Sequence, residues 1–307
     1  MFDVTREIAS RQIGSAVSTR TTPRVRSFFD EATNTVSYVV SDPQTGRAAI
    51  IDSVLGFDPA AGRTTPAPAD PILAYVHEQE LTIDWLLETH VHADHLSAAP
   101  YLQQKLGGKL GIGSAITQVQ NVFGKLFNAG TEFARDGSDF DHLFADGDRF
   151  MVGNLEGVAL HVPGHTPADM AFIIGDAAFI GDTLFMPDYG TARADFPGGD
   201  ARQLYRSIRR LLSLPPQTRL FLCHDYKAPG RGVYAWETTV AAQRSGNVHV
   251  HDGVSEDAFV AMREARDATL AMPRLILPSI QVNMRGGKLP PAEDNGTRYM
   301  RIPLDVL

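Results

Sequence analysis

The chain has 307 residues, of which 43% are hydrophobic and 21% charged, as expected for a soluble globular protein with one large domain or two modest ones. A formal net charge of −8 argues against a nucleic-acid partner, because phosphate recognition normally needs a basic face. A single cysteine, Cys223, and an N-terminal stretch interrupted by charges favour a reducing compartment with neither signal peptide nor membrane span. We therefore expect a cytoplasmic protein with no membrane partner.

The first half of the chain is predicted to combine short strands with helices. A weakly structured lead-in is expected over residues 1–22, and a Pro- and Gly-rich surface loop over 57–71. No structure is assigned to residues 119–140, which lack a clean periodicity. The strands are expected at 25–29, 35–40, 48–51 and 81–87, and the helices at 71–80 and 96–106.

The second half repeats this pattern. Strands are predicted at 157–162, 171–174, 177–180 and 219–223, and amphipathic helices at 201–214 and 256–271. Because residues 25–110 and 145–225 each contain strands followed by a helix, we expect an α+β protein. Its two mixed half-sheets should face each other, with the helices outside.

The most informative segment is Thr89-His90-Val91-His92-Ala93-Asp94-His95, which follows the buried strand at 81–87. Imidazole and carboxylate groups hold borderline divalent metals, and strand ends are where open sheets place ligand sites. His90 and His92 alternate, so they should project to one side, while Asp94 and His95 should open the next helix. The alternative is a solvated polar turn, but the segment favours a metalloenzyme.

Three later segments also place polar residues just after predicted strands. They are centred on His165 in Pro163–Pro167, Asp182 in Gly181–Thr183, and His224 in Cys223–Tyr226. Each alone could be an ordinary turn or buried side chain, but together they would converge on one crevice. Two other features receive ordinary interpretations: His249–Asp252 as a surface hairpin or loop, and Cys223 as a small buried residue.

These residues, in this order, resemble the metallo-β-lactamase superfamily, over most of residues 25–226. Several stretches are more similar to its persulfide dioxygenase branch (ETHE1-like, also called sulfur dioxygenases). The most discriminating is Ala192-Arg193-Ala194-Asp195-Phe196, because glyoxalase II enzymes share the metal motifs but not this element. Two further stretches, Trp236–Thr239 and Pro278–Asn283, look like a bacterial β-lactamase-like hydrolase subgroup within this branch.

The resemblance implies an αββα sandwich and one Fe(II) per chain held by His90, His165 and Asp182. His92, Asp94, His95 and His224 would then orient ligands and protons, or build a second site with Asp182 bridging. The implied reaction uses O2 to oxidise the sulfane sulfur of glutathione persulfide, or a related thiol persulfide, to sulfite. Arg193 and Tyr226 are candidate substrate contacts; the alternatives are a salt bridge of Arg193 with Asp195 or Asp169, and core packing for Tyr226.

The chain also departs from the resemblance. The segment before Gly190 lacks a lysine that glyoxalase II enzymes use against glutathione, and the 57–71 loop looks inserted. We expect a catalytic domain over 23–226 and a C-terminal extension over 227–307 packed on it. Asn283, Arg285 and Lys288 of that extension could reach a thiol carrier.

Two other functions use the same residues. The first is a glyoxalase II-like zinc hydrolase of thioesters or lactones, with one or two Zn per chain. The second is a catalytically idle metal-loaded sensor, which the complete ligand set disfavours. A homodimer is expected only from the frequency of dimers among soluble enzymes.

Overall fold

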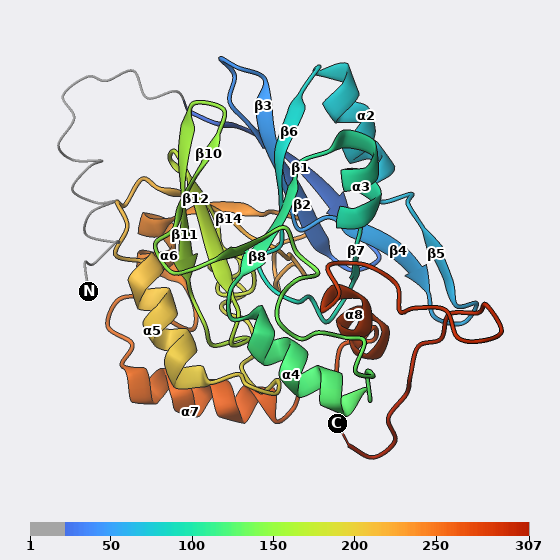
Figure 1. Cartoon of the computed structure of the whole chain (residues 1–307). Coiled ribbons are helices and arrows are strands. Elements are labelled where there is room, and N and C mark those ends of the chain that lie inside the picture. The colour runs from blue at the N-terminus through green and yellow to red at the C-terminus, as the bar shows by residue number, and fades with distance from the viewer. Residues whose placement is uncertain (1–21, 307) are drawn as a thin grey trace. The chain divides into compact units, whose positions relative to one another are not determined.

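The computed structural model describes residues 22–306, so the predicted lead-in lies outside it except for Thr22. The chain forms two compact units. Unit 1 contains Asp42–Thr45 and Ala145–Leu270, and unit 2 contains Val25–Ser41, Gly46–Phe144 and Ala271–Leu307. The predicted extension, residues 227–307, is therefore divided after residue 270 between the two units. Figure 1 labels many of the helices and strands of each unit.

Unit 2 is built on a six-stranded mixed sheet with strand order β1-β2-β3-β6-β8-β9. The strands predicted at 25–29, 35–40, 48–51 and 81–87 are confirmed. β3, β6, β8 and β9 run parallel, so their carboxyl ends share one edge of the sheet. The strands are β1 (Arg24–Asp30), β2 (Thr35–Ser41), β3 (Arg47–Ile51), β6 (Thr82–Leu87), β8 (Lys109–Gly113) and β9 (His142–Phe144).

A three-stranded sheet in unit 2, β5-β4-β7, corrects two predictions. The loop predicted at 57–71 includes a hairpin of β4 (Val54–Asp58) and β5 (Arg63–Thr65), because Asp58 accepts turn hydrogen bonds from the backbone of residues 60 and 61. The helix predicted from residue 96 begins later, because β7 (Leu96–Ser97) pairs with β4. Asp94 and His95 therefore precede a short strand instead of opening a helix.

Four helices belong to unit 2. The helix predicted at 71–80 is confirmed, and the segment without clean periodicity contains a helix. In this helix Val119 and Phe123 are buried, but the polar Gln120 is buried too and the apolar Val122 is exposed, which explains why its sequence lacks a clean periodicity. The helices are α2 (Asp70–Glu78), α3 (Ala99–Leu106), α4 (Ile116–Leu126) and α8 (Ile276–Asn283).

Unit 1 has a second six-stranded sheet, in the order β10-β11-β12-β13-β14-β15. β11 and β13 are each antiparallel to β12, and β14 is parallel to β13, so β11, β13 and β14 end at the same edge. The strands are β10 (Arg149–Val152), β11 (Leu155–His161), β12 (Met170–Ile174), β13 (Ala177–Phe179), β14 (Arg219–Phe221) and β15 (Glu237–Thr239).

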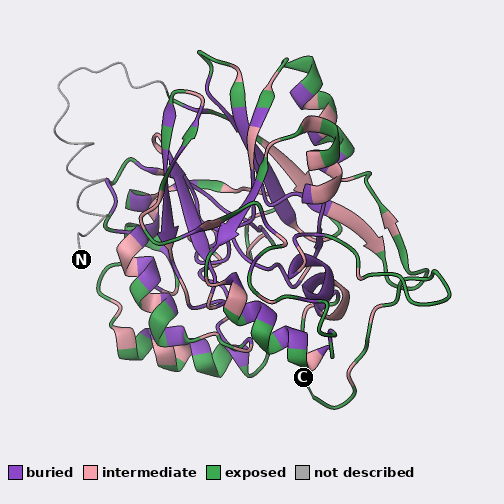
Figure 2. Ribbon diagram, viewed as in Figure 1, coloured by how far each residue is buried: buried purple, intermediate pink, exposed green. Residues whose placement is uncertain are grey.

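Within the part of unit 1 that the structure describes, the helices are α5 (Ala201–Leu211), α6 (Val240–Gly246) and α7 (Glu256–Asp267). The helices predicted at 201–214 and 256–271 are confirmed but end earlier. Leu204 and Ile208 of α5 join the same apolar core as Leu160 and Leu220 of the sheet, which anchors the helix to it. Figure 2 shows that β12 is buried, whereas α5 and α7 carry both buried and exposed residues. Within residues 22–306, no helix combines the length and apolar character needed to cross a bilayer.

Candidate metal centre

Unit 2 contributes the histidine segment at the carboxyl edge of its sheet. β6 ends at Leu87, and His90, His92 and His95 follow within eight residues. The ring centroids of His90 and His92 lie 4.1 Å apart, and those of His92 and His95 lie 4.3 Å apart. The predicted common side of His90 and His92 is thus confirmed. All three rings are at most 1% exposed, which contradicts the alternative of a solvated turn.

One nitrogen of each ring is held by a neighbour. His90 Nδ1 lies 3.0 Å from the Thr89 hydroxyl, and His95 Nδ1 lies 3.3 Å from both Asp94 Oδ2 and the Thr35 hydroxyl. The other nitrogen of His95, Nε2, is buried and has no hydrogen-bond partner among the described residues. One potential ligand atom each of His92, Asp94 and His95 lies within 4.8 Å of the others, as in a metal-binding cluster.

Asp52 is a buried site residue that the sequence analysis did not assign. It follows β3 with a φ of 51°, next to the end of β6, and its carboxylate lies 3.0 Å from His92 Nε2. It also accepts hydrogen bonds from the Thr89 amide and hydroxyl, both at 2.8 Å. Burial would raise the pKa of Asp52, but His92 and Thr89 hold that pKa below its ordinary value. Its position after a strand was the available signal.

Asn283, at the end of α8, holds the histidine segment from the other side. Its amide group donates to the backbone oxygens of His92 (2.8 Å) and His95 (2.7 Å), and its side-chain oxygen accepts from the Ser97 amide (2.8 Å). The suggested contact of Asn283 with a thiol carrier is therefore wrong, because this buried amide is committed to the backbone. The Arg285 guanidinium instead lies over the Phe133 ring, and the Lys288 ammonium group donates to the backbone oxygen of Asp139.

Unit 1 brings His165, Asp182 and His224 together at one edge of its sheet. They follow β11, β13 and β14, the three strands that end at that edge. Asp182 lies between the two imidazoles, with Oδ2 3.6 Å from His165 Nε2 and Oδ1 3.4 Å from His224 Nε2. All three are at least nine-tenths buried. The convergence predicted for these three positions is therefore present within unit 1.

The segment Arg193–Phe196 orients His165. The Arg193 backbone oxygen accepts a 2.8 Å hydrogen bond from His165 Nδ1, so the neutral ring carries its proton there and presents a lone pair at Nε2. The Phe196 ring packs edge-on against the imidazole, with centroids 5.1 Å apart. The Arg193 guanidinium pairs with both oxygens of Asp195 at 2.6 and 2.7 Å and lies over Phe196. Of the two salt bridges considered for Arg193, the one with Asp195 is present.

The Asp169 side chain accepts hydrogen bonds within the turn that follows His165 and does not pair with Arg193. It accepts hydrogen bonds from the Thr166 amide (2.7 Å) and hydroxyl (2.5 Å), so the suggested pairing with Arg193 is wrong. Burial raises the pKa of Asp169 to about 7, against the opposing effects of His165 and of the Thr166 hydrogen bonds. This carboxyl group therefore combines a structural role with a pKa near neutrality.

Tyr226 is 40% exposed and stacks on His224, with ring centroids 5.6 Å apart, so the alternative of core packing is wrong. Cys223 is buried, as predicted. The interpretation of His249 as part of a surface loop needs correction. His249 is partly buried, its Nδ1 accepts a hydrogen bond from the Thr191 amide at 3.1 Å, and a Cβ added to Gly190 would lie 2.1 Å from this atom. Burial, assisted by Arg263 and Arg266, lowers the pKa of His249 to about 4.

Comparison with known proteins agrees with these observations. The model of the metallo-β-lactamase superfamily matches residues 31–224. The chain belongs to the metallo-β-lactamase superfamily. The crystal structure of ETHE1 from Myxococcus xanthus superposes with a TM-score of 0.68 and 30% identity, over 86% of this chain and 99% of that one. The predicted metallo-β-lactamase fold is thereby confirmed.

Among superfamily members, a probable metallo-hydrolase of Burkholderia pseudomallei is 59% identical over 92% of this chain and 99% of its own length. A β-lactamase hydrolase-like protein of Xylella fastidiosa is 54% identical over 93% of this chain, and the match spans only 66% of that longer protein. The human mitochondrial persulfide dioxygenase ETHE1 is 28% identical over 94% of this chain and 98% of its own length.

The donor set in each unit suits the metal that this superfamily implies. His95 Nε2 is buried and has no hydrogen-bond partner within residues 22–306, and the buried carboxylate of Asp182 lies beside two imidazole nitrogens. Imidazole and carboxylate are groups that bind zinc or iron. Their orientation is set by surrounding residues, as is usual for metal ligands. The protein is thus a member of a metalloenzyme superfamily and has buried imidazole and carboxylate groups that could hold iron or zinc.

Proposed function

We propose that this protein is a persulfide dioxygenase in which His90, His165 and Asp182 hold one ferrous ion. Two imidazoles and one carboxylate are the donor set of non-haem iron oxygenases. The observation that carries the proposal is the similarity to ETHE1 proteins over nearly their whole length, which includes a 30%-identical crystal structure. In support, the Arg193–Phe196 element that distinguishes this branch is the segment that orients His165.

In the proposed reaction a thiol persulfide, O2 and water give a thiol and sulfite. A ferrous ion held by His90, His165 and Asp182 would supply the redox chemistry by which O2 oxidises the sulfane sulfur. The protein would orient the reactants: the Arg193–Asp195 pair presents a fixed guanidinium to an anionic substrate group. Tyr226, exposed beside His224, would contact the carrier. His92, Asp94, His95 and His224 would hold protons and orient the ligands.

A hydrolase is the second candidate, and two observations favour it. Asp182 lies between two imidazoles, as a carboxylate bridging two ions would, and His92, Asp94 and His95 form a separate cluster. The 59%-identical relative is named a probable metallo-hydrolase. Two zinc ions in this arrangement would generate a hydroxide for the cleavage of a thioester or lactone.

The deciding experiment combines metal content with two activity assays. Protein purified without oxygen is analysed for iron and zinc, then tested for O2 uptake with glutathione persulfide and for hydrolysis of S-lactoylglutathione. The proposal expects about one iron per chain and O2 uptake matched by sulfite release. Zinc alone, with thioester cleavage and no O2 uptake, would refute it in favour of the hydrolase. His165→Ala should lose the metal under both functions and serves as the site control.

A further inference from the structure

Helix α7 carries a buried ion pair outside the proposed metal ligands. Arg263 is 1% exposed, and its Nε and Nη2 atoms donate to Asp267 Oδ1 at 2.9 and 2.6 Å. Its remaining nitrogen, Nη1, donates to the backbone oxygen of Thr191 at 3.0 Å. The guanidinium is therefore directed at the segment that precedes Arg193.

The partner carboxylate reaches the same segment from the other side of Arg193. Asp267 Oδ2 accepts a 2.9 Å hydrogen bond from the Ala194 amide. The ion pair thus holds residues 191 and 194, which lie on either side of Arg193, and the Arg193 backbone oxygen accepts the hydrogen bond from His165 Nδ1. His249 adds a third contact by accepting from the Thr191 amide.

We propose that Arg263 and Asp267 are positioning residues for the metal ligand His165, acting through residues 191–194. By fixing the Arg193 oxygen on Nδ1, they hold the ring in one tautomer and direct Nε2 toward Asp182. The inference rests on the proposed metal centre but not on which reaction that centre performs. It also gives the part of the C-terminal extension that contains α7 a direct role in the site.

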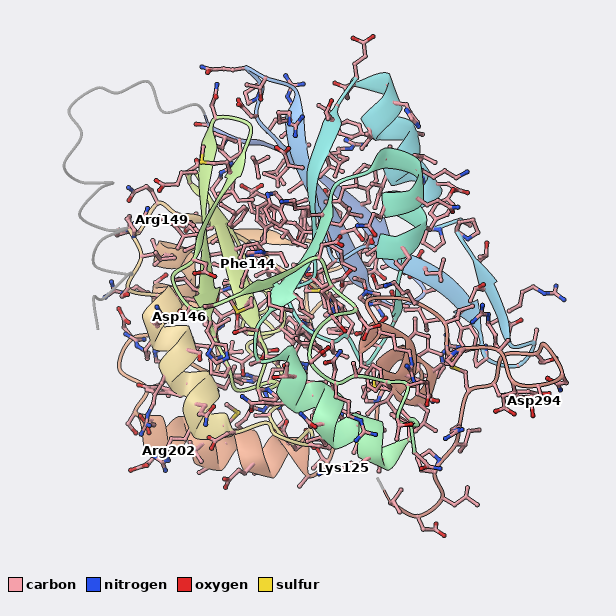
Figure 3. The ribbon with its side chains drawn as sticks, in the orientation of Figure 1. Lys125, Phe144, Asp146, Arg149, Arg202 and Asp294 are labelled. Carbon is pink, nitrogen blue, oxygen red and sulfur yellow. The ribbon has the colours of Figure 1, made fainter. Side chains whose placement is uncertain are left out.

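The energetics favour positioning over simple helix docking. A buried ion pair adds little net stability compared with a well-packed apolar pair, because desolvation offsets the attraction. Attachment of α7 to α5 is already supplied by other contacts. Phe259 packs on Tyr205 with ring centroids 5.5 Å apart, and Glu256 pairs at the surface with Arg202, the α5 residue labelled in Figure 3. What the buried pair adds is directed hydrogen bonds to the backbone on both sides of Arg193.

The test measures the affinity of the metal-free full-length protein for Co²⁺, together with its visible spectrum and its free energy of unfolding. Arg263→Lys and Asp267→Asn disrupt the ion pair and its hydrogen bonds to residues 191 and 194. Asp267→Asn keeps the size of the side chain and is therefore less disruptive to folding. Arg202→Lys changes a surface ion pair between the same helices. Phe259→Leu weakens the packing of α7 without touching residues 191–194 and is the control for lost stability.

We expect Arg263→Lys and Asp267→Asn to raise the Co²⁺ dissociation constant about 10- to 100-fold and to change the spectrum, the usual effect of losing an outer partner of a ligand. Arg202→Lys and Phe259→Leu should stay within about threefold of the unmodified protein. Wild-type affinity in a folded Asp267→Asn variant would overturn the inference. So would equal weakening by Phe259→Leu at the same loss of stability. If His165→Ala binds Co²⁺ with the affinity of the unmodified protein, His165 is not a metal ligand, and both the proposed metal centre and this inference are refuted. Failure of the dioxygenase reaction alone would appear only in the O2 assay.

Discussion

Replacing Asn283 by alanine tests how strongly α8 holds the histidine segment. The side chain is 5% exposed and makes three hydrogen bonds of 2.7 to 2.8 Å, to the backbone of His92, His95 and Ser97. Alanine would leave three buried backbone groups without this partner. Water cannot readily replace it in a tightly packed interior.

The magnitude follows from the number of bonds lost. A buried hydrogen bond contributes about 1 kcal/mol net, and each group left unsatisfied costs about 1–3 kcal/mol. With partial relaxation of the segment, we expect Asn283→Ala to lower the free energy of unfolding by about 3 kcal/mol. Because His92 and His95 would be less well held, metal affinity should fall about tenfold or more.

The assay is urea unfolding of the metal-free protein, so that metal binding does not add to the measured stability. Asn121→Ala is the matched control: this exposed asparagine of α4 makes one hydrogen bond to the Thr117 backbone oxygen. We expect its effect to stay within about 0.5 kcal/mol. A loss for Asn283→Ala as small as that of the control would refute the idea that α8 holds the segment.

Three further predictions concern unit 1 and the metal. Folding lowers the pKa of His249 from 6.5 to about 4. Between these two pH values the unfolded state therefore binds more protons at His249 than the folded state does. Stability should therefore drop as pH falls from about 6.5 to 4, by about 1–2 kcal/mol after allowance for solvent exposure, and less in His249→Gln; equal urea-denaturation profiles would contradict this. Gly164→Ala should cost more than about 2 kcal/mol, since its Cβ would lie 2.3 Å from the Leu204 backbone, whereas Gly62→Ala, with open space around it, should cost about 1 kcal/mol. Chelation should lower the melting temperature of the protein but not that of His165→Ala, as measured by calorimetry; an equal decrease in both would place the metal elsewhere.

The sequence placed each candidate ligand just after an apolar strand, and the structure has His165, Asp182 and His224 at such strand ends. Asp182 and His224 meet because β13 and β14 are parallel and end together. The sequence alone could place Asp182 and His224 at strand ends, because the end of an apolar segment can be recognised without knowing which strands pair with it. Short strands were harder to predict. Leu96–Ser97 is extended only because β4 pairs with it, so the sequence alone favoured a helix there.

The residues that orient the ligands were largely missed. Asn283 lies 188 positions from His95, and Arg263 lies 72 positions from Thr191, so no local pattern connects them. Asp52, Asn283 and Arg263 are ordinary polar residues in the sequence, and their burial and directed hydrogen bonds depend on how distant elements pack.

The sequence by itself determined the superfamily and the strands that end at the candidate site, and it supplied the candidate metal ligands, because these depend on local apolar runs and on residue chemistry. Only the tertiary structure decided which nitrogen of His165 carries its proton, and that α7 and α8 hold the ligand-bearing segments. Hydrogen bonds between residues far apart in the chain form only once the helices have packed, and their direction then fixes the orientation of the ligands.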